Sequence, residues 1–296
     1  GSPYTLSAYS GYTVLPTSGG ASTVNYRMTA ATTLAGSFSV NTLKLEAPSG
    51  DLALGGYTLT ISGGGLLMTG TTARNISGAG NLTAGYNPNG AFDLIVHQYC
   101  TADLTISAAI VDNGSNPTRL TKSGPGLLML SGANTLTDGI TLNAGTLYPS
   151  NSGTPLGTGT LTINGGVIYS FNGDPNSVGN CPQNWNGDFT ANMGRDLIFG
   201  AGAVTLNGNR TVTVLNPGGN RGRLYINGTV TDAGAGYGLT VALGATKGRL
   251  VLNGSTAYTG LTTVNGGLEL CGENTGNGGI TVNNGGALVI SHNAAL

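Results

Sequence analysis

The chain has 296 residues, of which 39% are hydrophobic and 8% are charged, and its formal net charge is -1. The eleven Lys and Arg residues are scattered, which argues against nucleic-acid binding, because a duplex binder needs a basic surface that displaces counterions. Disorder is also disfavoured, since disordered chains usually combine few apolar residues with a high net charge.

Short apolar alternations recur along the chain, and each is bounded by turn residues. In chain order they read TLTI, LLML, TLTI, TVTVL, RLVL and ALVI, at residues 58–61, 127–130, 160–163, 211–215, 249–252 and 287–290. Asn-Gly pairs close several predicted strands, and this pair accepts the positive φ of a sharp corner. No stretch has the apolar spacing of an amphipathic helix, so the sequence predicts an all-β fold.

A long internal repeat relates two parts of the sequence. SGANTLTDGITLNAGTL at 131–147 aligns with NGSTAYTGLTTVNGGL at 253–268, with matching positions 122 residues apart. Upstream, 104–113 aligns with 224–233 at an offset of 120, which pairs Asp112 with Asp232. We therefore predict that both aspartates serve a turn that each copy of the repeat needs, rather than a catalytic site.

Two all-β layouts compete for such strands. A sandwich or an immunoglobulin-like array needs longer strands, whereas these are short and end in Gly or Asn corners. The pattern favours a right-handed parallel β-helix, in which strands stack turn upon turn into an elongated rod. In TLT at 135–137 and at 160–162, we expect the Leu inside and the flanking Thr side chains in water.

The pattern divides the chain into four segments. Residues 1–49 are irregular and rich in Tyr, and we expect entry rungs there, with a lateral loop as the alternative. A first β-helical block follows at 50–169. Residues 170–188 hold two prolines, several Asn-containing turns and the only Trp, which predicts a loop excursion from the coil. Residues 189–296 form a second block with a truncated last rung, so we expect the chain to be an excerpt of a longer array.

Three of these stretches resemble a known repeat. GPGLLMLSGANTLTDGITLNAGTL at 124–147, GRLVLNGSTAYTGLTTVNGGLEL at 248–270 and GTGTLTINGG at 157–166 are similar to the autotransporter-associated β-strand repeat of bacterial passenger regions. Residues 94–110 and 183–214 resemble linking segments of very long repeat proteins of planctomycetes and verrucomicrobia. The resemblance implies a right-handed β-helix at the cell surface of a Gram-negative-type bacterium, or secreted from it.

The predicted excursion is the candidate ligand-contact loop, because solenoids commonly place binding residues on such loops. Its candidate contacts are Trp185, Asn184 and Asn186, and the alternative for Trp185 is that it covers an apolar corner. We predict no catalytic residue, cofactor or metal site. Structural calcium is left open without assigned ligands, since Gly-Asp turns occur but the calcium-binding nonapeptide of exported repeat proteins does not.

The remaining reactive side chains are isolated in sequence. Cys100, Cys181 and Cys271 form no metal-binding cluster, and buried free thiols are favoured over an intermolecular bridge. His97 and His292 lack an obvious acid–base partner. Two other classes are disfavoured. A pectin-type or glycosidic enzyme needs converging carboxylates, and binding of ice or crystals by Thr rows needs a regular spacing that the sequence does not show.

The sequence thus predicts a non-enzymatic structural repeat protein that forms an extracellular or cell-surface rod or fibre segment. An adhesin that binds surfaces or glycans through loops projecting from the β-helix is the alternative. The expected partner is another β-helical rung, through end-to-end self-association or within a longer chain. A glycan or surface ligand is a further option, and no membrane-spanning segment is expected.

Overall fold

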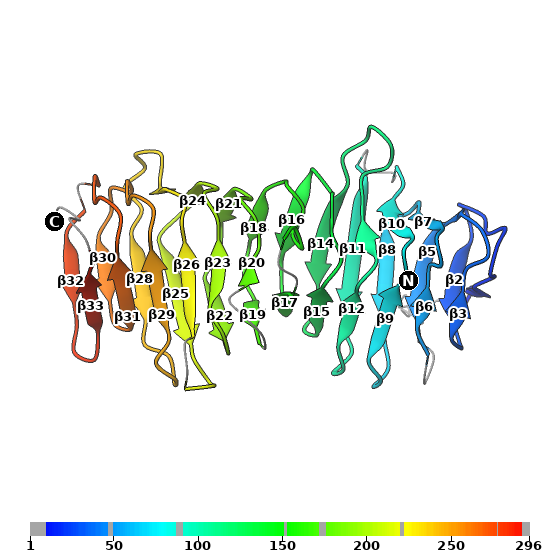
Figure 1. The fold of residues 1–296 in the computed structure, drawn as a ribbon, viewed down its shortest axis with the longest axis horizontal. Helices are drawn as coiled ribbons and strands as arrows, with labels where there is room; N and C mark the ends of the chain where they lie inside the picture. The colour runs from blue at the N-terminus through cyan, green and yellow to red at the C-terminus, as the bar shows by residue number, and fades with distance from the viewer. Residues whose placement is uncertain are drawn as a thin grey trace, which may run out of the picture.

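The computed structural model describes residues 10–46, 50–86, 91–150, 153–171, 176–219, 222–276 and 278–291. They form an elongated parallel β-solenoid, in which the chain winds progressively along one long axis (Figure 1). The predicted all-β parallel fold is confirmed: within these residues every pair of strands is parallel and no helix occurs. His292 lies outside the described residues.

The strands of the solenoid lie on three sides, and most turns contribute a strand to each side. The first side is an eleven-stranded sheet of β1 (Thr13–Val14), β2 (Asn25–Met28), β5 (Thr42–Leu45), β8 (Gly65–Met68), β11 (Asp93–Gln98), β14 (Arg119–Ser123), β16 (Gly139–Leu142), β18 (Leu161–Ile163), β21 (Gln183–Trp185), β24 (Val204–Leu206) and β27 (Val230–Thr231).

The second side is a twelve-stranded sheet of β3 (Thr32–Thr33), β6 (Leu52–Ala53), β9 (Arg74–Ser77), β12 (Leu104–Ile106), β15 (Leu127–Leu130), β17 (Thr146–Pro149), β19 (Val167–Ser170), β22 (Phe189–Met193), β25 (Arg210–Leu215), β28 (Leu239–Ala242), β30 (Thr262–Val264) and β32 (Ile280–Val282).

The third side is divided into two sheets. Near the N-terminus it holds β4 (Phe38–Val40), β7 (Thr58–Ile61), β10 (Asn81–Ala84) and β13 (Ala109–Ile110). Near the C-terminus it holds β20 (Asn176–Ser177), β23 (Leu197–Phe199), β26 (Arg223–Ile226), β29 (Arg249–Leu252), β31 (Gly267–Leu270) and β33 (Ala287–Ile290).

The core is built from inward-pointing residues that stack between turns, as the alternation predicts. In TLTI of β7 both Thr side chains are partly exposed, while Leu59 and Ile61 are fully buried. One inward row of the first side runs through Leu66, Val96, Lys122, Leu142, Ile163, Trp185 and Leu206, each aligned with the next. Each fully buried apolar side chain contributes about 1.5–3 kcal/mol, so the rod is stabilised turn by turn.

A buried asparagine spans the gap between the two sheets of the third side. Residues 131–138 pass this side without a strand, and Asn134 lies there with 1% of its surface exposed. Its Oδ1 accepts a hydrogen bond from the main-chain N–H of Ile110 at 2.8 Å, and its Nδ2 donates to the carbonyl of Pro155 at 2.6 Å. The side chain therefore satisfies backbone groups that a strand would otherwise pair.

The two copies of the sequence repeat occupy different sides. By sequence, β15 corresponds to β29, β16 to β30 and β17 to β31. Yet β15 and β17 lie on the second side and β16 on the first, whereas β29 and β31 lie on the third side and β30 on the second. Five steps along the second side lead from β15 to β28, and β29 comes next on the third side. The offset of 122 residues is thus five turns and one further side.

The prediction of a loop excursion at 170–188 is wrong for its last part. Residues 183–185 form β21, which pairs with β18 on one side and β24 on the other, and so they belong to the coil. Residues 172–175 of the same segment lie outside the described residues. None of the described residues forms a helix long and apolar enough to cross a membrane.

Candidate functional site

Trp185, the predicted ligand contact, is part of the core. Its surface is completely buried, and the indole Nε1 donates to Oε1 of Gln183 at 3.0 Å. The ring meets Phe189 edge-on with 5.0 Å between centroids. Stacking on an external sugar would require the ring to leave this packing, so the structure corrects that role. The alternative, that Trp185 covers an apolar corner, is closer to the structure, although the ring lies in an inward row and not at a corner.

Asn184 lies on the outward surface of β21 and Asn186 follows directly after this strand, and they belong to two parallel rows. Together we call these rows the Thr/Asn face: one row holds Thr121, Thr141, Thr162, Asn184 and Thr205, and the other holds Ser123, Asn143, Asn164, Asn186 and Asn207. None of these ten side chains carries a charge. The regular rows were missed from the sequence because the intervals between them differ from turn to turn.

The asparagines of the second row form a hydrogen-bonded ladder. Asn164 donates from Nδ2 to Oδ1 of Asn143 at 2.7 Å, Asn186 donates to Asn164 at 3.0 Å, and Asn207 donates to Asn186 at 2.7 Å. Each side-chain amide thus bonds to the amide of the preceding turn, as the backbone strands beside it do. The ladder gives the face a fixed array of polar groups at the strand spacing of about 4.7–4.9 Å.

The two repeat-related aspartates hold corners together, as predicted. Asp112 accepts hydrogen bonds from the main-chain N–H of Thr118 at 2.7 Å and of Thr137 at 2.9 Å, and from Oγ1 of Thr137 at 2.7 Å. Asp232 repeats the contact one side further round, where Oδ2 accepts from Oγ1 of Thr259 at 2.8 Å. In both copies the carboxylate joins its own turn to the Thr of the next turn.

Asp232 also receives main-chain donors from its own corner. Gly234 and Gly236 donate their N–H groups at 2.9 and 2.8 Å, and Tyr237 donates at 2.9 Å. Burial opposes the charged form, but the hydrogen bonds from Thr259 and these amides outweigh it and hold the pKa of Asp232 well below its usual range. The carboxylate is a structural acceptor, and its low pKa favours the ionised form.

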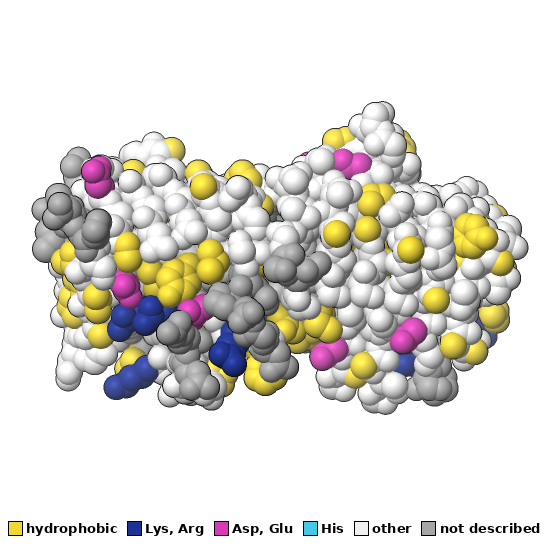
Figure 2. Space-filling model, viewed as in Figure 1, with side chains coloured by type: hydrophobic (Ala, Val, Ile, Leu, Met, Phe, Trp, Pro, Cys, Tyr) yellow, Lys and Arg dark blue, Asp and Glu magenta, His cyan; other side chains and the backbone are white. Residues whose placement is uncertain are grey.

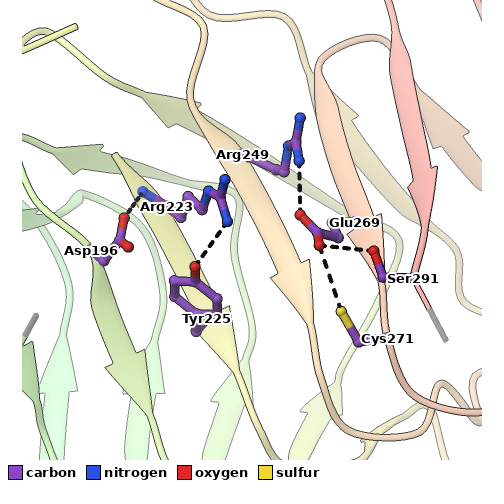
Figure 3. A network of polar contacts seen from close by, with 7 residues as sticks. All are labelled: Asp196, Arg223, Tyr225, Arg249, Glu269, Cys271 and Ser291. Carbon is purple, nitrogen blue, oxygen red and sulfur yellow. Dashed lines mark hydrogen bonds and ion pairs between the residues drawn. The ribbon is translucent and has the colours of Figure 1, made fainter. Parts of the chain in front are cut away.

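A polar network covers the third side near its C-terminal end (Figure 3). Arg249 donates to Oε2 of Glu269 at 2.8 Å, and Ser291 donates to Oε1 of the same carboxylate at 3.0 Å. The hydrogen bond from Arg249 outweighs burial and lowers the pKa of Glu269. The thiol of Cys271 lies 3.9 Å from Oε1 of Glu269, and burial together with that carboxylate raises the pKa of Cys271.

This network has little capacity for nucleophilic chemistry. A lowered carboxylate pKa makes Glu269 a weaker base, and a raised thiol pKa disfavours the reactive thiolate of Cys271. Cys100 and Cys181 are buried, and burial raises the pKa of Cys181 to about 11. All three cysteines are free, and the first two match the prediction of buried thiols. In the described ranges no three His, Cys, Asp or Glu side chains come together as metal ligands.

Comparison with known families supports the sequence resemblance directly. Residues 120–148 and 247–267 match the model of the passenger-associated-transport-repeat. We call these two matched segments the first and the second passenger repeat. The similarity to autotransporter-associated repeat proteins is thereby confirmed, and such repeats indicate a secreted or cell-surface protein of Gram-negative bacteria. No curated protein and no solved structure matches the chain.

The matched segments include the features that hold successive turns together. The first passenger repeat contains Asn134 of the third-side gap and Thr137 of the aspartate contact, and the second contains Thr259. The two matched segments begin on different sides of the solenoid, the first at β14 on the first side and the second just before β29 on the third side. An origin in planctomycetes or verrucomicrobia remains a prediction.

Lys122, in the first passenger repeat, is a lysine within an apolar inward row. Its side chain is fully buried between Val96 and Leu142, and Nζ donates to the carbonyls of Ser123, Gly124 and Ala144 at 3.0, 2.8 and 3.0 Å. Burial lowers the pKa of Lys122 from 10.5 to about 8. The ammonium cross-links a corner by its three donors, at the cost of desolvation.

We expect Lys122 to make the fold more stable as pH rises. Because its folded pKa of about 8 lies below the unfolded value of 10.5, the unfolded chain binds more protons between these values. The resulting gain in the free energy of unfolding is absent below pH 8 and grows to about 3 kcal/mol above pH 10.5. Urea unfolding at pH 7.5 and 9.5 should show a rise that Lys122→Met removes. An equal pH dependence in both proteins would contradict the assignment.

Proposed function

We propose that this chain is a non-enzymatic spacer segment of an extracellular or cell-surface protein, whose contribution is length and resistance to unfolding. The observation that carries the proposal is the continuous core, in which fully buried inward residues run from turn to turn from Val40 to Leu268. The passenger repeats support export, and the unreactive Glu269 and Cys271 support the absence of catalysis.

The location is tested on intact cells. Antibodies raised against the folded chain should label unpermeabilised cells of the source bacterium or detect the protein in the culture medium. External protease should remove the cell-bound signal while leaving a cytosolic marker intact. Labelling that requires permeabilisation would overturn the surface assignment. The purified chain should also leave pectins, glucans and peptides unchanged.

End-to-end contact with a further rung is the proposed mode of association. β32 and β33 lie at the ends of their sheets and leave apolar side chains open, with Val282 46% and Ile290 41% exposed. An exposed strand edge with apolar flanks tends to pair with another strand. A continued chain or a second copy would cover this surface equally well.

Ile290→Pro should weaken such association of the isolated chain. The N–H groups of Ala287 and Ser291 donate toward β31, so the alternate residue Ile290 directs its N–H to the open edge, and proline lacks this donor. Light scattering over a concentration series should show growth of the wild type into longer particles and little growth of the variant. Ile290→Thr keeps the donor and serves as the matched control. A wild type that stays monomeric at high concentration would refute end-to-end association.

The Thr/Asn face favours adhesion as a second candidate function. It offers hydroxyl and amide groups in two fixed rows without charge, which suits a neutral surface or glycan that presents hydroxyl groups at regular intervals. Replacing Thr162 and Thr205 by Lys should abolish such binding without disturbing the core. Binding of intact glycans that survives this change would assign adhesion elsewhere.

A further inference from the structure

Along one outward row of the third side, the side chains become much smaller toward the C-terminus. The strand register places Arg223, Arg249, Gly267 and Ala287 on successive strands β26, β29, β31 and β33. Two long cationic side chains are therefore followed by a glycine and an alanine. A hollow of about 170 Å³ opens at this step, and Lys247, Gly248, Arg249, Gly267 and Ala287 are among its lining residues.

The charged residues that line this hollow, Lys247 and Arg249, are both cationic. Lys247 is exposed, and Arg249 is partly buried with one N–H bound to Glu269 at 2.8 Å. On the far side of Arg249, the guanidinium of Arg223 donates to the hydroxyl of Tyr225 at 3.1 Å, while Asp196 accepts from the main-chain N–H of Arg223 (Figure 3). Basic side chains also gather on the lower part of the C-terminal half in Figure 2.

We propose that this hollow binds an oxyanion carried by a saccharide, with Lys247 and Arg249 as its cationic contacts. Its volume is below the roughly 300–1,000 Å³ of pockets for drug-sized ligands, so it fits one small charged group rather than a whole oligosaccharide. Ammonium and guanidinium groups form short, strong hydrogen bonds with carboxylate, phosphate and sulfate oxygens. Ala287 is exposed, and its methyl group leaves the outer side of the hollow open to solvent, where the attached sugar would lie.

The inference is independent of the spacer role, because it needs only the geometry of this corner. A carboxylate of a uronic acid, a sugar phosphate and a sugar sulfate share the required chemistry. Separate titrations with glucuronate, glucose 6-phosphate and glucose 6-sulfate distinguish these sources, and glucose is the uncharged control. The full chain, labelled with ¹⁵N, should show saturable amide shifts at Gly248 and Gly267 with at least one of the anions and none with glucose.

Three variants locate the site. Lys247→Gln removes one contact from an exposed position and should weaken binding about tenfold, since hydrogen bonds to charged groups contribute strongly. Ala287→Leu fills the hollow without changing charge and should abolish binding. Arg119→Gln makes the same charge change on the first side and should bind as the wild type does, and the unperturbed amide spectrum confirms that each variant is folded.

We therefore expect saturable amide shifts at Gly248 and Gly267, weaker binding in Lys247→Gln, no binding in Ala287→Leu and normal binding in Arg119→Gln. Rising salt should weaken the binding, because charge pairs near the surface are screened. The proposal is overturned if none of the three anions gives saturable shifts. It is equally overturned if Ala287→Leu binds normally, or if Arg119→Gln weakens binding as much as Lys247→Gln.

Discussion

Trp185→Ala is expected to lower the free energy of unfolding by about 3–5 kcal/mol, as large aromatic deletions in cores do. The indole fills the inward row between Ile163 and Leu206, and its N–H already has Gln183 as a partner. Truncation would leave a cavity and an unpaired buried amide group on Gln183. Urea denaturation followed by circular dichroism measures the change.

The matched control is Asn184→Ala, on the outward surface of the same strand. Outward substitutions away from special backbone positions usually change stability by less than about 0.5 kcal/mol. A small effect of Trp185→Ala combined with a lost ligand interaction would restore the surface role that the sequence suggested. A large effect on stability alone agrees with the core position.

Gly145→Ala is expected to cost more than about 2 kcal/mol, because two penalties act together. Its φ of 74° lies in the left-handed region, where a side chain is strained. A Cβ would also collide with the carbonyl oxygen of Gly124 in the preceding turn and stand 2.7 Å from that of Gly126. Backbone carbonyls within stacked turns cannot move without disturbing the strand pairing.

Gly114→Ala separates the two penalties. Gly114 has a similar φ of 62°, but nothing lies within 4 Å of the added Cβ, so its replacement should cost only about 1–2 kcal/mol. Thermal unfolding of both variants tests the difference. Equal losses would show that the close approach of successive turns at Gly145 contributes nothing.

The same close approach explains why the repeat keeps this glycine. Gly267, the counterpart of Gly145 in the second passenger repeat, would place a Cβ 2.7 Å from the carbonyl oxygen of Gly248. Gly145 has a positive φ, whereas Gly267 is not among the positive-φ glycines. The shared cause is therefore the approach of two backbones, and the left-handed conformation is an additional demand at Gly145.

The sequence by itself determined the local features. Alternation of apolar and polar residues predicts which side chain of TLTI points inward, because successive side chains on a strand face opposite directions. The equivalent positions of Asp112 and Asp232 predict a shared turn role, because short-range hydrogen bonds depend on nearby residues. The fold class followed, since short strands with tight corners have few other ways to bury their apolar residues.

Only the tertiary structure decided which turn lies against which. The two copies of the repeat look interchangeable in sequence, yet they lie on different sides, because the number of residues per turn depends on corners and gaps along the intervening chain. Trp185 looks like a loop residue among asparagines and prolines, but pairing with β18 and β24 turns it inward. Lys122 is placed in the core by its alignment with Val96 and Leu142, which are distant partners that local patterns do not identify. Stacking between turns is a long-range interaction, and it fixes both the buried rows and the hollow beside Arg249.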